Sequence, residues 1–178
     1  MSMGTSRIET ADVESLEHRV REVTRGLITF DGCMLAGKTQ LMREIARRIG
    51  TQGLDLDDFV ERQRGVFVEA LRLQELTAAI EQALAKFGVM LVSGVCMLEV
   101  LERIGCESSL TVYVQANNQD GTPDDIDLIG AEFGRRPDLV DFFGELENEC
   151  FSYHARYRPR NGADVLFIRS LEQDKRPG

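Results

Sequence analysis

The chain lacks the features that mark secreted, metal-caged or membrane proteins. Its four cysteines (Cys33, Cys96, Cys106 and Cys150) form no CxxC pair, and only two of the 178 residues are histidine. Because no metal-ligand spacing links them, we expect reduced thiols rather than a disulfide framework. The opening residues, MSMGTSRIET, contain no apolar signal-peptide core, and no segment reaches the length that spans a bilayer. These absences predict a cytoplasmic protein without membrane contact.

Positive charge is also scarce. The chain has 21 lysine and arginine residues against 30 aspartate and glutamate residues, which gives a formal net charge of −9 at pH 7. An acidic surface argues against non-specific binding to nucleic acid or anionic membranes, because both need a cationic face. A small anionic ligand remains compatible with this charge, since a few basic side chains in a cleft suffice locally. We therefore expect small-molecule partners and no nucleic acid.

The rest of the composition is that of an ordinary globular domain. Hydrophobic residues make up 43% of the chain and charged residues 29%, and no internal repeat or low-complexity tract is evident. A chain of 178 residues can bury a substantial core without disulfides or structural metals. We predict one domain over residues 1–178, with an N-terminal helical extension at 1–25, as a monomer or a homodimer.

Short apolar runs alternate with amphipathic segments along the chain. Strands are predicted at 27–30, at the start of GLDLDDFVERQRG, at 89–92, at 110–114 and at 165–168. Helices are predicted at 12–21, 38–49, 73–86 and 98–104, and from Pro137 to about residue 156. This alternation predicts an α/β fold with a central, mostly parallel five-stranded sheet and helices on both faces. The polar stretch 116–138 is predicted to be a functional or mobile loop.

The stretch DGCMLAGKTQ between the first of these strands and the next helix carries a complete GxxxxGK[ST] motif. In this motif a sharp turn makes successive backbone N–H groups converge on a di- or triphosphate, and the glycines allow the close approach. Lys38 would place its charge on the β- and γ-phosphates, and Thr39 would put its hydroxyl on Mg²⁺. The alternative is that Gly32 and Gly37 serve only a strand-to-helix turn. The residues predicted to bind nucleotide are Gly32, Cys33, Met34, Leu35, Ala36, Gly37, Lys38, Thr39 and Gln40.

With this motif in place, ITFDGCMLAGKTQLMREIARRI resembles the start of uridine-kinase-like proteins, including the Asp31-Gly32 pair that opens the loop. The resemblance implies the three-layer αβα fold of P-loop nucleoside triphosphate hydrolases. It also implies ATP and Mg²⁺ as the cofactors.

A second constellation, Asp55-Leu56-Asp57-Asp58, lies about one strand–helix unit after the phosphate loop. Phosphoryl transfer to an alcohol needs a group that takes the acceptor's proton and a metal that neutralises charge, and carboxylates suit both tasks. The alternative is that Asp57 or Asp58 merely caps a helix starting near Phe59.

DLDDFVERQRG is similar to the shikimate kinase pattern, and Asp57-Asp58-Phe59 resembles a stretch of uridine kinases. The resemblance implies that Asp57 contacts the acceptor and takes its proton, with Asp58 beside it. It also implies that Asp55 helps to hold Mg²⁺ indirectly, by contacting a group that coordinates the ion. Arg72, in an Arg-x-x-Glu pattern, would hold an acid substrate, although Arg and Glu three apart on a helix also form ordinary surface pairs.

Two departures from these families are visible in the sequence. Ser93 stands where many P-loop proteins carry an acid at the end of the third strand, and no NKxD occurs, so motor ATPases and GTPases are not expected. The stretch 116–138 occupies the place of the kinase lid, where Arg135 and Arg136 are its basic residues and would stabilise the transferring phosphoryl group. Each of these arginines could equally be a solvent-facing residue at a helix N-terminus.

Together these features predict an ATP- and Mg²⁺-dependent kinase that phosphorylates a hydroxyl of a small molecule, with Lys38, Asp57, Arg135 and Arg136 as catalytic residues. Two alternatives stay open at this stage. One is a nucleotide-binding regulatory protein that phosphorylates no metabolite, and the other is a degenerate loop that binds no nucleotide.

Overall fold

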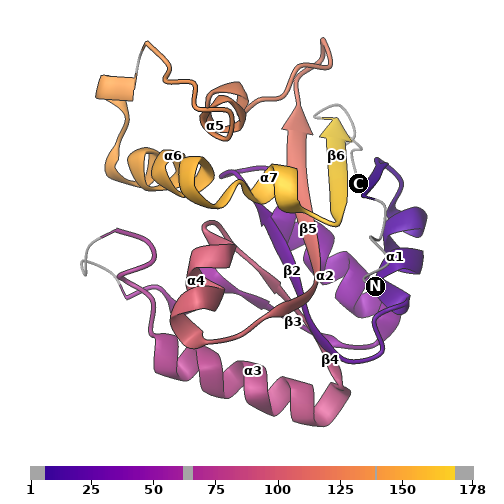
Figure 1. Ribbon diagram of the computed structural model, residues 1–178. Helices are drawn as coiled ribbons and strands as arrows, with labels where there is room; N and C mark the ends of the chain where they lie inside the picture. The colour runs from indigo at the N-terminus through magenta and orange to yellow at the C-terminus, as the bar shows by residue number, and fades with distance from the viewer. Residues whose placement is uncertain (1–6, 62–65, 139, 171–178) are drawn as a thin grey trace, which may run out of the picture.

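In a computed structural model, which describes residues 7–61, 66–138 and 140–170, the chain forms one six-stranded sheet with helices on both faces (Figure 1). The strand order across the sheet is β1-β6-β5-β2-β4-β3, and every neighbouring pair is parallel. The strands are β1 (Ile8–Thr10), β2 (Gly26–Gly32), β3 (Gln52–Asp55), β4 (Val89–Ser93), β5 (Ser108–Asn117) and β6 (Val165–Ser170). The carboxyl ends of all these strands therefore meet at one edge of the sheet.

The helices connect the strands as crossovers, as a parallel sheet requires. The α-helices are α1 (Val13–Arg21), α2 (Lys38–Ile49), α3 (Leu73–Phe87), α4 (Met97–Ile104), α5 (Ile126–Ala131), α6 (Glu145–Tyr157) and α7 (Pro159–Gly162). Two 3-10 turns, η1 (Leu56–Phe59) and η2 (Val140–Phe142), complete the described secondary structure. No helix among the described residues is long and apolar enough to cross a membrane.

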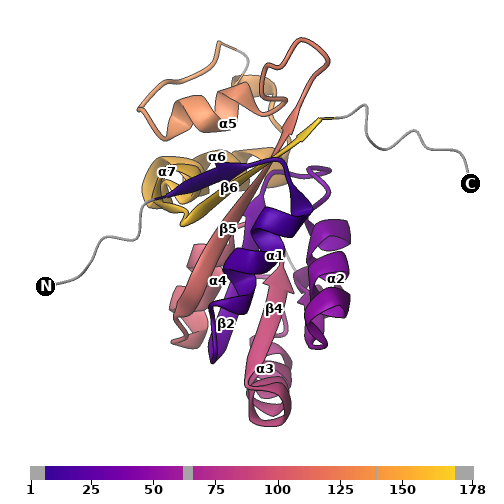
Figure 2. The same ribbon diagram turned by 90° about the vertical axis from the view of Figure 1, so that its right-hand side faces the viewer.

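The sheet lies between two helical layers (Figure 2). On one face, α1 and α2 contribute Leu16 and Ile45 to a core with Ile28 of β2 and Leu91 of β4. On the other face, α3, α4 and α6 pack against alternate residues of the same strands. Burial on both faces explains why the strand segment GVMLVSG is continuously apolar.

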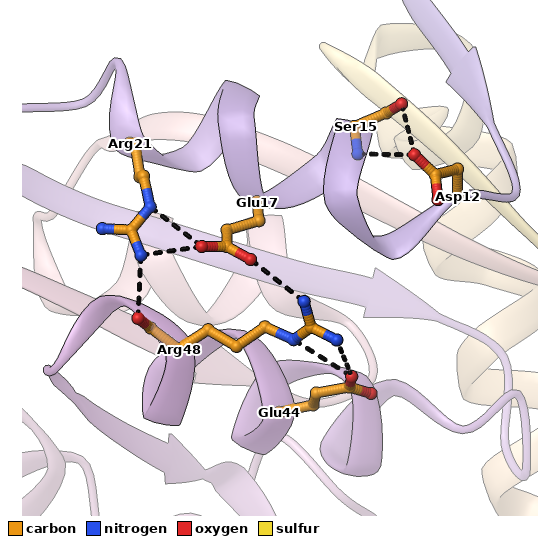
Figure 3. Close-up of polar contacts among 6 residues, drawn as sticks. All are labelled: Asp12, Ser15, Glu17, Arg21, Glu44 and Arg48. Atoms are coloured by element: carbon orange, nitrogen blue, oxygen red, sulfur yellow. Dashed lines mark hydrogen bonds and ion pairs between the residues drawn. The ribbon is translucent and has the colours of Figure 1, made fainter.

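A surface network attaches the N-terminal helix α1 to α2, the helix that follows the phosphate loop (Figure 3). Glu17 accepts hydrogen bonds from Arg21 at 2.7 and 2.9 Å and from Arg48 of α2 at 3.1 Å, which lowers the pKa of Glu17. Arg48 also pairs with Glu44 at 2.8 Å, and Arg21 donates to the Arg48 carbonyl at 2.8 Å. Asp12 caps α1 by accepting from the Ser15 N–H at 2.8 Å. The contacts of Arg21 and Arg48 hold α1 against α2 on the same face of the sheet.

The predicted α/β fold with a parallel sheet is confirmed, but the sheet has six strands instead of five. The additional strand β1 pairs with β6 at the edge and has only three residues, of which Ile8 is 37% exposed. A strand this short and exposed leaves no alternating pattern to detect.

The helix predicted to begin at Pro137 begins instead at Glu145, and the N–H of its N-cap, Gly144, donates to the Glu147 carboxylate at 2.7 Å. Residues 116–138, expected to lack regular structure, contain the end of β5 and the six-residue helix α5. The glycine expected to end the segment after GLDLDD, at position 65, lies outside the described residues.

Candidate active site

The phosphate-loop motif forms a tight reversal between the buried strand β2 and helix α2. Gly32 has a φ of 139°, and a Cβ there would lie 2.3 Å from the Val114 carbonyl oxygen, so only glycine fits. Leu35 (φ 60°) and Gly37 (φ 79°) are both left-handed, with Ala36 between them. Left-handed residues in such a loop turn successive N–H groups toward one point, which creates an anion-binding concavity. The strained conformation of Leu35 is the backbone outlier that this concavity requires.

The N-terminus of α2 leaves its free N–H groups open to a ligand. Its N-cap, Gly37, provides no side-chain hydrogen bond, and no acid occupies its first turn. The positive end of the helix dipole is therefore uncompensated by side chains, which favours a bound anion. Lys38, which is only 7% exposed, donates its Nζ proton to the Cys33 carbonyl across the loop. The amides and this ammonium group together fit a polyphosphate.

A chain of hydroxyl and carboxylate groups lies immediately beside the loop. Thr39 Oγ1 donates to Asp55 Oδ2 at 2.6 Å, and Ser93 Oγ donates to Thr39 Oγ1 at 3.2 Å. The sheet register causes this meeting, because Asp55 at the end of β3 pairs with Ser93 at the end of β4. Hydroxyl and carboxylate oxygens are the donors that Mg²⁺ prefers. The pair Thr39 and Asp55 therefore fits a magnesium ion held between the loop and β3.

Asp55 also organises the turn that carries the second acid. Its Oδ1 accepts the Asp57 N–H at 3.2 Å, so Asp55 caps η1 and Asp57 does not. Asp57 is thereby available to a ligand, and it lines the same cavity as Lys38 and Asp55. Partial burial and the neighbouring Asp55 carboxylate raise the pKa of Asp57, while Lys38 lowers it. A carboxylate whose pKa is raised in this way has the character of a general base.

The cavity that unites these groups has a volume of about 710 Å³ and opens at the carboxyl edge of the sheet. Its lining residues are Met34, Leu35, Gly37, Lys38, Thr39, Gln40, Asp55, Asp57, Phe67, Gly94, Val95 and Leu146. A cavity of this size is typical of small-molecule sites. It brings together most of the predicted nucleotide, metal and base residues.

Three of the predicted arginines and one aspartate do not line this cavity. Arg72 donates to the Asp58 carbonyl at 2.8 Å and pairs with Glu75 at 3.4 Å, as the surface-pair alternative expects. The Asp58 side chain is exposed. Arg136 pairs with Asp141 at 3.0 Å on the surface, and Arg135 lies in the exposed segment after α5. The structure therefore gathers the loop, Asp55 and Asp57, but not these four side chains.

Sequence reasoning missed an arginine that contacts the loop from the last strand. Arg169 of β6 donates to the Gly37 carbonyl at 2.9 Å and to Gln40 Oε1 at 3.2 Å. A Cβ on Gly37 would lie 2.2 Å from its guanidinium, so the second motif glycine also makes room for this contact. No local pattern could reveal this pair, because the two residues are brought together only by the strand order.

A buried polar cluster beneath the loop was also missed. Tyr153 of α6 donates to Asp31 Oδ2, and Asp31 Oδ1 accepts the Gly32 N–H at 2.7 Å. Burial raises the pKa of Asp31 despite these hydrogen bonds. Nearby, His154 Nδ1 lies 3.0 Å from Glu132 Oε1, which ties α6 to the segment after α5. Tyr153 and Asp31 thus connect α6 to Gly32 at the start of the phosphate loop.

Comparisons with known proteins identify no family for this chain. No protein-family model matches it, and no curated protein matches it in sequence. Among solved structures, a candidate fructose transport system kinase of Silicibacter sp. TM1040 is 12% identical with a TM-score of 0.48, over 89% of this chain and 100% of that one. Shikimate kinase of Bacteroides thetaiotaomicron is 20% identical with a TM-score of 0.36, over 80% and 85% of the two chains.

Shikimate kinase of Aquifex aeolicus vf5 is 17% identical with a TM-score of 0.39, over 80% of this chain and 86% of that one. All three of these proteins are named as kinases. Identities and scores this low carry no argument about activity or substrate, so the site itself has to support a function.

Proposed function

We propose that this protein is an ATP- and Mg²⁺-dependent kinase that transfers the γ-phosphoryl group to a hydroxyl of a small molecule. The observation that carries the proposal is that Lys38, Asp55 and Asp57 line one cavity with the phosphate loop. A phosphate-binding lysine, a carboxylate beside the Thr39 hydroxyl and a carboxylate that can take the acceptor's proton thus lie within reach of one ligand.

Each residue has a separate task in the proposed reaction. The amides of the loop and Lys38 bind the β- and γ-phosphates and offset their charge. Thr39 and Asp55 would hold a magnesium ion, which would neutralise charge on the phosphate oxygens. Asp57 accepts the proton of the acceptor hydroxyl. The oxygen of that hydroxyl forms a bond to the γ-phosphorus, and the bond between the γ-phosphorus and the β–γ bridging oxygen breaks. The products are ADP and a phosphate monoester.

A second candidate function is nucleotide binding without phosphorylation of a metabolite. Its support is that neither Arg135 nor Arg136 lines the cavity, although a kinase would draw charge stabilisation from its lid. Ser93, which stands where many P-loop proteins carry an acid, also supports this second candidate.

One pair of measurements distinguishes the two candidates. Calorimetric titration with ATP and with GTP tests binding, and ADP release in the presence of nucleosides, sugars, hydroxy acids and simple alcohols tests transfer. The kinase proposal expects ATP binding together with acceptor-dependent ADP release and a phosphorylated product. Nucleotide binding with no product from any acceptor would favour the second candidate, and no nucleotide binding would contradict both.

A further inference from the structure

Among the described residues, the polar side chains that line the cavity all have a task in the proposed reaction except Gln40, which accepts a hydrogen bond from Arg169. Lys38 and Gln40 belong to the phosphate loop and the first turn of α2, and Thr39 and Asp55 form the metal pair. Asp57 faces the acceptor hydroxyl in this scheme. The remaining lining is therefore the part of the cavity that meets the body of the acceptor.

That remaining lining is apolar and comes from three separate segments. Phe67 follows η1, Val95 follows β4, and Leu146 lies in the first turn of α6. Met34 and Leu35 of the phosphate loop also line the cavity. Gly37 and Gly94 complete the described lining.

The apolar wall is held in place by a charged group outside the cavity. Glu149 of α6 accepts the Phe67 N–H at 2.7 Å and the Val68 N–H at 2.9 Å. This two-point contact fixes the segment that carries Phe67 to the helix that carries Leu146. Val95 is only 7% exposed, so this part of the wall is set by packing in the core. Hydrogen bonds thus join two segments of the wall, and core packing holds the third.

The surroundings of the cavity are unfavourable for an acidic acceptor. An adjoining cavity of about 260 Å³ shares Met34 and Leu35 with the first. Its lining includes the carboxylates Asp124, Asp125, Asp127 and Glu147 and no lysine or arginine among the described residues. Like charges repel a carboxylate that approaches this side of the phosphate loop.

From this distribution we propose that the acceptor is an uncharged alcohol whose hydroxyl is attached to an apolar body, such as an aromatic ring or a branched aliphatic chain. This inference rests on the proposed kinase function and narrows its substrate class. A polyol or a hydroxy acid would bury polar groups without partners against Phe67, Val95 and Leu146, which disfavours binding by roughly tenfold to a hundredfold for each group.

Matched pairs of acceptors test the proposal directly. The first pair is 4-methylbenzyl alcohol and 4-(hydroxymethyl)benzoic acid, which share the same primary hydroxyl and differ by a carboxylate. The second pair is cyclohexylmethanol and glucose. We expect kcat/KM with ATP to be at least about tenfold higher for the apolar member of each pair. Equal or better turnover of glucose or the acid would overturn the inference and leave the kinase function standing. Failure of both apolar alcohols to accelerate ADP release would overturn the inference, whereas the kinase function is overturned only if the wider panel of nucleosides, sugars and hydroxy acids also fails.

Two variants test whether the apolar wall causes the preference for apolar acceptors. Phe67→Ala should raise the KM for 4-methylbenzyl alcohol about tenfold and leave the KM for ATP unchanged, because it removes apolar contact with the acceptor only. Phe87→Ala, at the far end of α3, is the matched control and should change neither value. Leu146→Arg should shift the preference within the first pair toward the acid. An unchanged acceptor KM in a folded Phe67→Ala protein would overturn the assignment of this wall.

Discussion

The Thr39 hydroxyl donates a hydrogen bond of 2.6 Å to Asp55 Oδ2, which joins the first turn of α2 to the end of β3. In many P-loop proteins the acid beside this hydroxyl lies on the strand next to the loop strand, where this chain has Ser93. Here Ser93 donates to Thr39 at 3.2 Å, and the carboxylate comes from the next strand outward. The acid that the sequence lacks at position 93 is thus supplied by a neighbouring strand.

If Asp55 serves the metal, Asp55→Asn should weaken Mn²⁺ binding in the presence of ADP about tenfold or more, because loss of a supporting carboxylate costs that much at other metal sites. Electron paramagnetic resonance of free Mn²⁺ measures this without any turnover. Ser93→Ala should have a smaller effect, and Ser109→Ala, at the amino end of β5, none. Unchanged Mn²⁺ affinity in Asp55→Asn would remove this residue from the metal site.

Lys38→Met should lower the affinity for ATP roughly a hundredfold, since hydrogen bonds to charged groups contribute about 1.5–3 kcal/mol. Calorimetric titration with ATP checks the prediction. Lys86→Met is the control, because Lys86 is exposed at the end of α3, where its ammonium group lies 4.8 Å from the centre of the Phe87 ring. Equal affinities in the two variants would contradict the assignment of the loop as a phosphate site.

Asp31 gives a pH dependence of stability with a defined sign. Burial raises the pKa of Asp31 above its unfolded value near 3.8, so the folded state binds this proton more tightly. Its contribution to the free energy of unfolding therefore decreases as the pH rises from the unfolded pKa through the raised folded pKa. Asp31→Asn removes this decrease, so the variant should gain stability relative to the wild type as the pH increases.

Urea denaturation across about pH 4 to pH 8 measures this difference. Asp12→Asn provides a control of opposite sign, because the hydrogen bonds from Ser15 lower the pKa of Asp12 (Figure 3). The stability contributed by Asp12 is present above its unfolded pKa and is lost as the pH falls through its lowered folded pKa. If the free energies of unfolding of Asp31→Asn and the wild type changed with pH in parallel, the raised pKa of Asp31 would be contradicted.

Glu132 anchors the segment after α5 to α6 and α7. Its carboxylate is 3% exposed, accepts the N–H groups of Arg160 and Asn161 at 2.9 Å each, and lies 3.0 Å from His154 Nδ1. Glu132→Ala should lower the free energy of unfolding by about 3 kcal/mol, because it leaves buried partners unpaired. The exposed Glu81→Ala on α3 should change it by less than about 0.5 kcal/mol. Similar urea midpoints for both variants would contradict this role.

Much of the fold was predictable because its signals are local. The apolar run at Leu27, the glycine that ends α2 and the helical stripe of α3 each identify an element without reference to the rest of the chain. The edge strand β1 and the start of α6 were not predictable. The first depends on pairing with β6. The second depends on the N-cap Gly144, which lies seven residues after the proline that marked the expected start.

The site divides in the same way. The phosphate loop and the Asp55 and Asp57 pair lie in contiguous motifs, and the structure brings them to one cavity. Arg169, Tyr153 and Leu146 reach the loop or the cavity only through strand order and helix packing, so no spacing rule could identify them. The roles of Arg72, Arg135 and Arg136 stay predictions, since the cavity of this structure does not include them.

The central claim is that Asp57 takes the proton of the acceptor hydroxyl. The rate of transfer should therefore depend on the unprotonated form of this carboxyl. Asp57→Asn preserves the shape of the side chain but cannot accept the proton. Glu14→Gln on α1 is the matched control for removal of one negative charge.

The decisive measurement is single-turnover phosphoryl transfer by Asp57→Asn at saturating ATP and acceptor, alongside its calorimetric affinity for ATP. We predict a rate at least about a hundredfold below that of the wild type and of Glu14→Gln, with ATP affinity within about threefold of the wild type. A wild-type rate in Asp57→Asn would contradict the assignment of the base.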